Sequence, residues 1–389
     1  MKEISLNKLV YNNFFYALGL ITLSLGIFNV MGYSFSIANI IVLFLFISYC
    51  KKNSLIVFAI YFSLISYLLI IAAFFFVKLD LFEFIKSFLL TSIMLLVYLS
   101  SLARPIYNSK LDFIKIISII GIIIVAFECL QIMEYLILGS SNSWFLLDRF
   151  SISTANDIGR FQAVNFLTFI RPISFYHEPS YLGIILLILL ISANELKVNK
   201  LIIFIYYFGI IVSFSTTALV FLVLYVIIKN FESLKKILFV GLLIMISLNY
   251  FLDRETLDTV FRFNEILNSG TSGNERLVGP FDYLVNEVFV NHHYFGIPLG
   301  QSDLVFNNSF YLLFLYFGVL TPLLLIIFSV YIIYKFRSNS FKYLIAFFSL
   351  LFLNGAIFTL ESTLVLYCLN YSFVLGNTIP QPISLTLKS

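Results

Sequence analysis

The stretch RPISFYHEPSYLG, residues 171–183, gathers three side chains capable of acid–base or anion chemistry at the start of a strongly apolar run. Arg171 carries a fixed fork of donors that suits bidentate capture of phosphate or carboxylate, and it stays charged. His177 and Glu178 are candidates for a general base. Because Pro179 has the character of a first helical residue, Glu178 stands at a predicted helix N-terminus, where free N–H groups favour an anion.

Glu178 has two interpretations that the sequence leaves open. It is either a helix cap or structural partner of Arg171, or a carboxylate at a reaction centre that acts as base or orients an attacking hydroxyl. The helix dipole stabilises its charged form, which weakens it as a base. His177 is the competing candidate for the base, since histidine side chains ordinarily change charge near neutral pH. The alternative is that His177 only lies at the membrane interface and has no role in the reaction.

Apolar residues dominate the rest of the chain. The 389 residues are 61% hydrophobic and 11% charged, whereas a soluble domain carries roughly 25% charged residues. Apolar runs of roughly 20 residues, enough for a helix to cross a hydrocarbon layer of about 30 Å, recur from Phe14 almost to the C-terminus. The composition predicts an all-α polytopic membrane protein, with residues 1–389 as a single integral membrane domain.

About twelve transmembrane helices are expected from these runs. Within residues 201–229, the polar residues Ser213, Ser215 and Thr216 favour two short helices over one long helix. Two helices of about 14 residues reach only about 21 Å each, so their polar junction should stop short of the far surface. The predicted spans are 14–31, 33–50, 54–77, 82–102, 112–138, 180–196, 201–214, 216–229, 236–252, 308–334, 341–358 and 362–377.

Positive charge indicates the orientation, because cytoplasmic loops carry an excess of Lys and Arg. With the broken pair of helices, Lys197 and Lys200 fall on the same side as Lys229, whereas a single helix would separate them. Of the 16 lysines, 14 are then cytoplasmic, as are both termini. Six of the eight arginines and all three histidines lie outside.

The external arginines predict an anionic ligand. Lysine would be enough to orient the protein in the membrane, whereas the arginine guanidinium is suited to binding phosphate or carboxylate. For any single arginine, an ion pair with a loop acid such as Asp148 or Asp157 stays the alternative. The six arginines occupy two large external (periplasmic) loops, residues 139–179 and 253–307, and are Arg149, Arg160, Arg171, Arg254, Arg262 and Arg276.

Two adjacent segments of the second external loop have residue patterns that predict local structure. NSGTSGNE at residues 268–275 predicts a turn-rich hinge. The following RLVGPFDYLVNEVFVN at residues 276–291 predicts a partly helical segment.

Charged residues within the predicted spans are sparse. Glu128, Glu134 and Glu361 would each cost a few kcal/mol if left unpaired in lipid, so we expect them to face the protein interior. The three cysteines have no disulfide or metal-site spacing. Without a P-loop, an Asp-x-Asp or a Gly-rich dinucleotide motif, no cofactor, metal or nucleic-acid partner is expected.

An arginine followed by F-x-x-E-P-S at the head of a span resembles the bacterial O-antigen polymerase (Wzy) and O-antigen ligase superfamily. The second half of the chain carries further motifs of the same superfamily. They are S-G-x-x-R, a loop ending in G-x-x-x-G, and an Asn before an aromatic-aliphatic span. The matching residues are Arg171, Phe175, Glu178, Pro179, Ser180, Ser272, Gly273, Arg276, Gly296, Gly300, Asn308 and Gly318. Many relatives have a histidine directly before that Asn, where this chain has Asn307.

The resemblance implies a metal-independent glycosyltransferase with a GT-C-like membrane fold in the bacterial cytoplasmic (inner) membrane. It would polymerise undecaprenyl-pyrophosphate-linked repeat units into O-antigen or capsule-type polysaccharide, with undecaprenyl pyrophosphate as leaving group. A chain-length regulator is a candidate partner. The pyrophosphate-binding candidates are Arg171, Arg276, Arg160 and Arg254; the candidate bases are Glu178 and His177; further candidates are His292, His293 and Asn308.

Two other functions stay open. An O-antigen ligase would transfer glycan to an acceptor. A flippase or exporter of lipid-linked glycan would line a path across the whole membrane with arginines and acids. External clustering of the arginines counts against transport, and the chain size with aromatic-rich spans favours polymerase over ligase.

Overall fold

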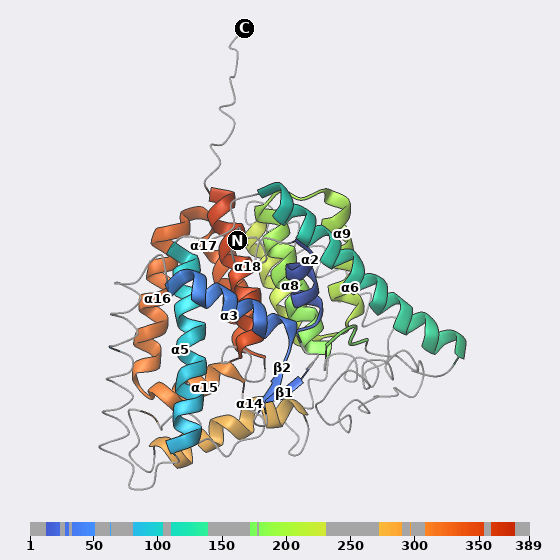
Figure 1. Ribbon diagram of the computed structural model, residues 1–389. Helices are drawn as coiled ribbons and strands as arrows, with labels where there is room; N and C mark the ends of the chain where they lie inside the picture. The colour runs from blue at the N-terminus through green and yellow to red at the C-terminus, as the bar shows by residue number, and fades with distance from the viewer. Residues whose placement is uncertain are drawn as a thin grey trace.

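A computed structural model describes residues 13–23, 28–30, 33–50, 63, 81–103, 110–138, 172–176, 179–230, 272–289, 296, 308–353 and 359–377. These residues form a helical bundle with one short two-stranded hairpin (Figure 1). The hairpin pairs β1 (Phe28–Val30) antiparallel with β2 (Tyr33–Phe35). The helical class is therefore confirmed, with the hairpin as an addition.

The helices differ widely in length, from one short turn to an α-helix of 29 residues. In chain order they are α2 (Asn13–Ile21), α3 (Ile37–Cys50), α5 (Leu81–Ala103), α6 (Lys110–Leu138), α8 (Pro179–Glu195), α9 (Lys200–Val212), α10 (Thr216–Lys229), α14 (Ser272–Tyr283), the π-helix η3 (Leu284–Phe289), α15 (Ser309–Phe317), α16 (Leu320–Phe336), the 3₁₀-helix η4 (Arg337–Asn339), α17 (Ser340–Leu351) and α18 (Leu360–Asn377).

The bundle is built around α8 and α18. Every residue of α8 from Leu182 to Ala193 is buried, as expected of a helix that is apolar on all sides. α8 packs against α6, α9, α10, α17 and α18, and α18 packs also against α3 and α5. In Figure 1, α5 and α16 lie on one side of this centre, α6 and α9 on the other, and α14 crosses below.

Three apolar stretches in the described part of the chain are long enough to cross a membrane by length and composition. They are Phe84–Ala103, Asp112–Ile137 and Leu320–Leu351. The third consists of α16 and α17, because the backbone turns at Arg337, where φ is +47°, and the two helices pack together. Shorter apolar helices accompany them, and the whole set is consistent with a helical membrane protein. The predicted spans 54–77 and 236–252 fall almost wholly outside the described residues.

The first two predicted spans, 14–31 and 33–50, are wrong in extent. α2 ends at Ile21, and α3 begins only after the hairpin. The strand sequences FNV and YSF are rich in aromatic and β-branched residues, which favour strands. Hydrophobicity alone does not separate such a short strand from a helix.

The predicted span 308–334 is broken in the structure, between α15 and α16. Gly318 lies at the break with φ +52°, in the region that glycine adopts most readily. The hydroxyl of Thr321 donates a hydrogen bond of 2.8 Å to the carbonyl of Leu313, near the end of α15. The next predicted span, 341–358, is also too long, because α17 ends at Leu351.

The broken pair predicted between residues 201 and 229 is confirmed as α9 and α10. Phe214, with φ +47°, separates them, and the Ser215 hydroxyl accepts a hydrogen bond of 3.3 Å from the Ala218 N–H. A Cβ built on Gly183 would lie 2.9 Å from the Ser215 Cβ. The junction therefore packs on α8 about 6 Å below Pro179, where that helix begins.

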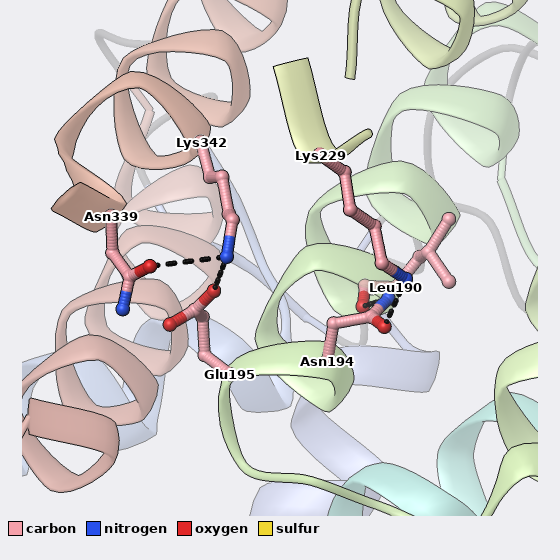
Figure 2. Close-up of polar contacts among 6 residues, drawn as sticks. All are labelled: Leu190, Asn194, Glu195, Lys229, Asn339 and Lys342. Carbon is pink, nitrogen blue, oxygen red and sulfur yellow. Dashed lines mark hydrogen bonds and ion pairs between the residues drawn. The ribbon is translucent and has the colours of Figure 1, made fainter. Parts of the chain in front are cut away.

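Lysines of α10 and α17 bind side chains at the C-terminal end of α8 (Figure 2). Lys342 of α17 forms a 2.9 Å ion pair with Glu195 at the end of α8. Lys229 of α10 donates a 2.7 Å hydrogen bond to Asn194 of α8. Lys335 of α16 donates to the Leu102 carbonyl of α5. That this end faces the cytoplasm, as the positive charge predicts, stays a prediction.

We expect the ion pair between Glu195 and Lys342 to fix α8 against α17. The side chain of Glu195 is 5% exposed and that of Lys342 is 23% exposed. Lys342→Ala leaves the carboxylate without this partner and should cost on the order of 2 kcal/mol. The measurement is the midpoint of thermal unfolding in detergent, with Lys115→Ala on the exposed face of α6 as the control.

The charge-reversed double variant Glu195→Lys with Lys342→Glu should regain most of the lost stability. Equal midpoints for Lys342→Ala and Lys115→Ala would show that the pair contributes nothing.

Candidate functional site

Most of the residues predicted to carry chemistry lie outside the described part of the chain. They are Arg160, Arg171, His177, Glu178, Arg254, His292 and His293. Their roles stay predictions. The structure does describe the loop between Arg171 and His177, the start of α8, the backbone around Arg276, and Asn308.

A buried glutamine holds the loop Pro172–Tyr176. Gln131 of α6 accepts hydrogen bonds at Oε1 from the N–H groups of Ile173, at 3.1 Å, and Ser174, at 2.8 Å. Its Nε2 donates to the carbonyl of Ser174 at 3.2 Å. Both Gln131 and Ser174 have 0% exposure. One side chain thus satisfies three backbone groups of an irregular segment inside the bundle.

Three further contacts anchor the same loop. The Ser174 hydroxyl donates a 2.9 Å hydrogen bond to the Ile124 carbonyl on α6. The ring of Phe175 stacks on that of Phe127, with centroids 4.3 Å apart. The Tyr176 hydroxyl donates to the Leu20 carbonyl of α2 at 3.0 Å. The loop is therefore tied to two helices immediately before α8 begins.

Gln131 is a site residue that the analysis of the sequence did not single out. Glu128, Gln131 and Glu134 recur at three-residue spacing, which places them near one face of α6. This row of polar side chains along an otherwise apolar helix marks one face of α6 in the sequence, but it does not indicate which backbone groups Gln131 binds.

Glu128 faces the protein interior, as expected, and is fully buried. It points toward α9, because a Cβ built on Gly209 would lie 3.1 Å from Glu128 Oε2. Neither carboxylate oxygen has a hydrogen-bond partner among the residues that the structure describes. Glu134, further along the helix, is half-buried.

The start of α8 is Pro179, as predicted. Gly183, one turn further, contacts the junction at Ser213 and Ser215 that precedes α10. The N-termini of α8 and α10 are therefore neighbours. Each helix N-terminus contributes partial positive charge from its dipole.

Arg276 belongs to α14, and its helix starts earlier than predicted. α14 begins at Ser272, so the second half of the predicted hinge at residues 268–275 is helical. The segment predicted to be partly helical is confirmed, since α14 and η3 together reach Phe289. Leu284 of η3 packs in a small apolar cluster with Phe84 of α5 and Leu312 of α15.

Three residues of the second resemblance motif surround α15. Asn308 caps the helix, with its side chain accepting a 3.0 Å hydrogen bond from the Tyr311 N–H. Gly318 ends it. Gly296 has φ +93°, and a Cβ there would lie 2.4 Å from the Tyr316 carbonyl oxygen. Backbone geometry around one short helix therefore favours glycine at positions 296 and 318, and a capping side chain at position 308.

The fold defines a helical membrane protein, with a hydrogen-bonded loop and two neighbouring helix N-termini at one end of its central helix. The chain belongs to the WcaD colanic acid polymerase family, whose model matches residues 17–373. This membership implies a glycosyltransferase-type polymerase of polysaccharide in the inner membrane, consistent with the Wzy-type resemblance. No curated protein and no solved structure matches the chain.

We expect the Asn308 side chain to stabilise the protein as an N-cap. Asn308→Ala should lower the free energy of unfolding by about 1 kcal/mol, because the Tyr311 N–H loses its acceptor. Asn308→Ser keeps a capping oxygen and should unfold near the wild-type temperature. A loss of polymerisation in Asn308→Ser at unchanged stability would instead assign Asn308 a role beyond capping.

Proposed function

We propose that this chain polymerises undecaprenyl-pyrophosphate-linked oligosaccharide repeat units on the outer face of the cytoplasmic membrane. Membership of a polymerase family along residues 17–373 carries the proposal. Apolar helices long enough to cross a membrane suit a lipid-linked substrate. Donor and acceptor are both lipid-linked glycans, and the product is an O-antigen or capsule-type polysaccharide.

The transfer is a single displacement. A hydroxyl oxygen of the acceptor unit attacks the anomeric carbon of the growing chain and forms the new glycosidic bond. The bond from that carbon to the pyrophosphate oxygen breaks, and undecaprenyl pyrophosphate leaves with the electron pair. Glu178 or His177 accepts the hydroxyl proton, with His292 or His293 as the second choice.

Arginines neutralise the charge that builds on the leaving group. Arg171 and Arg276 are the principal donors, each worth a few kcal/mol if well placed, and Arg160 and Arg254 support them. The anchored loop Pro172–Tyr176, which follows Arg171 directly, supports this assignment. The neighbouring N-termini of α8 and α10 add partial positive charge at the same end of α8.

The test of the function is the surface-glycan length profile of cells that lack this gene. Cells complemented with the wild type should show long polymer. Deletion cells and cells carrying Arg171→Ala should show glycan capped at a single repeat unit. Arg171→Lys should lose most activity, because a point charge does not reproduce the guanidinium fork. Arg337→Lys, exposed at the lysine-rich end of the bundle, is the matched control and should polymerise normally.

Other profiles would contradict the proposal. Surface glycan absent altogether, with polymer accumulating on the lipid carrier outside, would identify a ligase. Units trapped on the inner side would identify a flippase. Wild-type polymer in Arg171→Lys would remove Arg171 from the reaction.

We expect the transfer to be independent of divalent metal ions, since the arginines supply the positive charge. Purified enzyme with lipid-linked repeat units should keep its rate in excess EDTA. The matched control is the same reaction with added Mg²⁺ or Mn²⁺, which should neither raise the wild-type rate nor rescue Arg171→Lys. A rate abolished by EDTA and restored by Mg²⁺ would overturn metal independence.

A further inference from the structure

We propose that Gln131 is a positioning residue for the transfer reaction. It fixes the backbone that joins Arg171 to Glu178, and it acts on the substrate only through these two residues. The inference rests on the function proposed above. It starts from the three hydrogen bonds that this one buried amide makes to the loop Pro172–Tyr176.

The anchored atoms are close in the chain to both predicted functional residues. Arg171 precedes Ile173, whose N–H is bound by Gln131, by two residues. Two residues span at most about 7.6 Å between Cα atoms, so the chain itself keeps Arg171 within that distance of the anchored Ile173. On the other side, Tyr176, tied to Leu20, is two residues before Glu178. One anchor therefore lies two residues after Arg171, and another lies two residues before Glu178.

The chemistry of the amide explains why glutamine suits this position. Its oxygen accepts from two successive N–H groups, and its nitrogen donates to the carbonyl of Ser174. An uncharged amide offers an acceptor oxygen with two lone pairs and a donor nitrogen side by side, which matches the two N–H groups and the carbonyl of this loop. Without it, two N–H groups and a carbonyl would stand unpaired in an apolar interior.

The loop conformation is one that the chain would leave if released. Ser174 has φ +50°, which is unfavourable for a residue with a Cβ. Gln131 binds both the N–H and the carbonyl of Ser174, and the Ser174 hydroxyl is held by Ile124. Loss of the amide therefore frees a strained residue three positions from Arg171, and we expect the backbone that follows Arg171 to shift.

A purely structural role makes a different prediction from a positioning role. Asn370 of α18 provides the matched comparison, because it is another fully buried amide. It donates to the Tyr98 carbonyl and to the Ser101 hydroxyl of α5, and accepts from the Tyr343 hydroxyl of α17. It joins helix to helix, whereas Gln131 joins a helix to the loop that follows Arg171.

The experiment compares Gln131→Leu with Asn370→Leu as purified full-length proteins. Thermal unfolding in detergent gives the stability of each, and polymerisation of lipid-linked repeat units gives kcat and KM per folded molecule. Both variants should unfold at lower temperature. Gln131→Leu should lower kcat by about 100-fold, as expected for a catalytic group displaced by about 1 Å. Asn370→Leu should keep the wild-type kcat.

Two milder variants keep the test decisive if Gln131→Leu fails to fold. Gln131→Glu retains an acceptor for the two N–H groups but loses the amide donor to Ser174, and Ser174→Ala removes only the bond to Ile124. A lower kcat in either variant at wild-type unfolding temperature supports positioning. Wild-type kcat in both overturns it.

The result separates this inference from the proposed function. Wild-type kcat in folded Gln131→Leu, with Arg171→Ala inactive, overturns the positioning role and leaves the polymerase intact. Full polymer length in cells that lack the gene overturns both.

Discussion

Backbone N–H and carbonyl groups outside regular helices need partners within the protein, because a hydrocarbon layer offers none. Several of the irregular segments that the structure describes inside this bundle have a polar side chain that meets this need. Gln131 serves the loop Pro172–Tyr176, Ser215 caps the start of α10, Thr321 reaches back to α15, and Asn308 caps that helix. At these four places in the described part of the chain, the departure from helix coincides with such a side chain.

This constraint explains what the sequence could predict and what it could not. The start of α8 at Pro179 and the break between α9 and α10 were predictable, because proline and serine act on the backbone beside them. Gln131 was not, since its partners at Ile173 and Ser174 are more than forty positions away. No local pattern reports a contact of that range.

The errors in the predicted spans have the same origin. Hydropathy over a window registers how apolar a segment is, and it averages over a single turn. It therefore merged α2 with the following strand, and it ran through Gly318 between α15 and α16. In both places the deciding residues were present as glycine, aromatic or β-branched types. Their effect depended on neighbours that only the fold supplies.

The short helices α9 and α10 have a consequence for how the protein enters the membrane. With 13 and 14 residues, each reaches about 20 Å, less than the hydrocarbon layer of about 30 Å. Neither helix can partition into lipid alone without exposing the junction at Ser213–Ser215. We infer that the two insert as one hairpin, after α8 is already in place to cover that junction with Gly183. The order of synthesis, α8 before α9 and α10, is also the order that insertion requires.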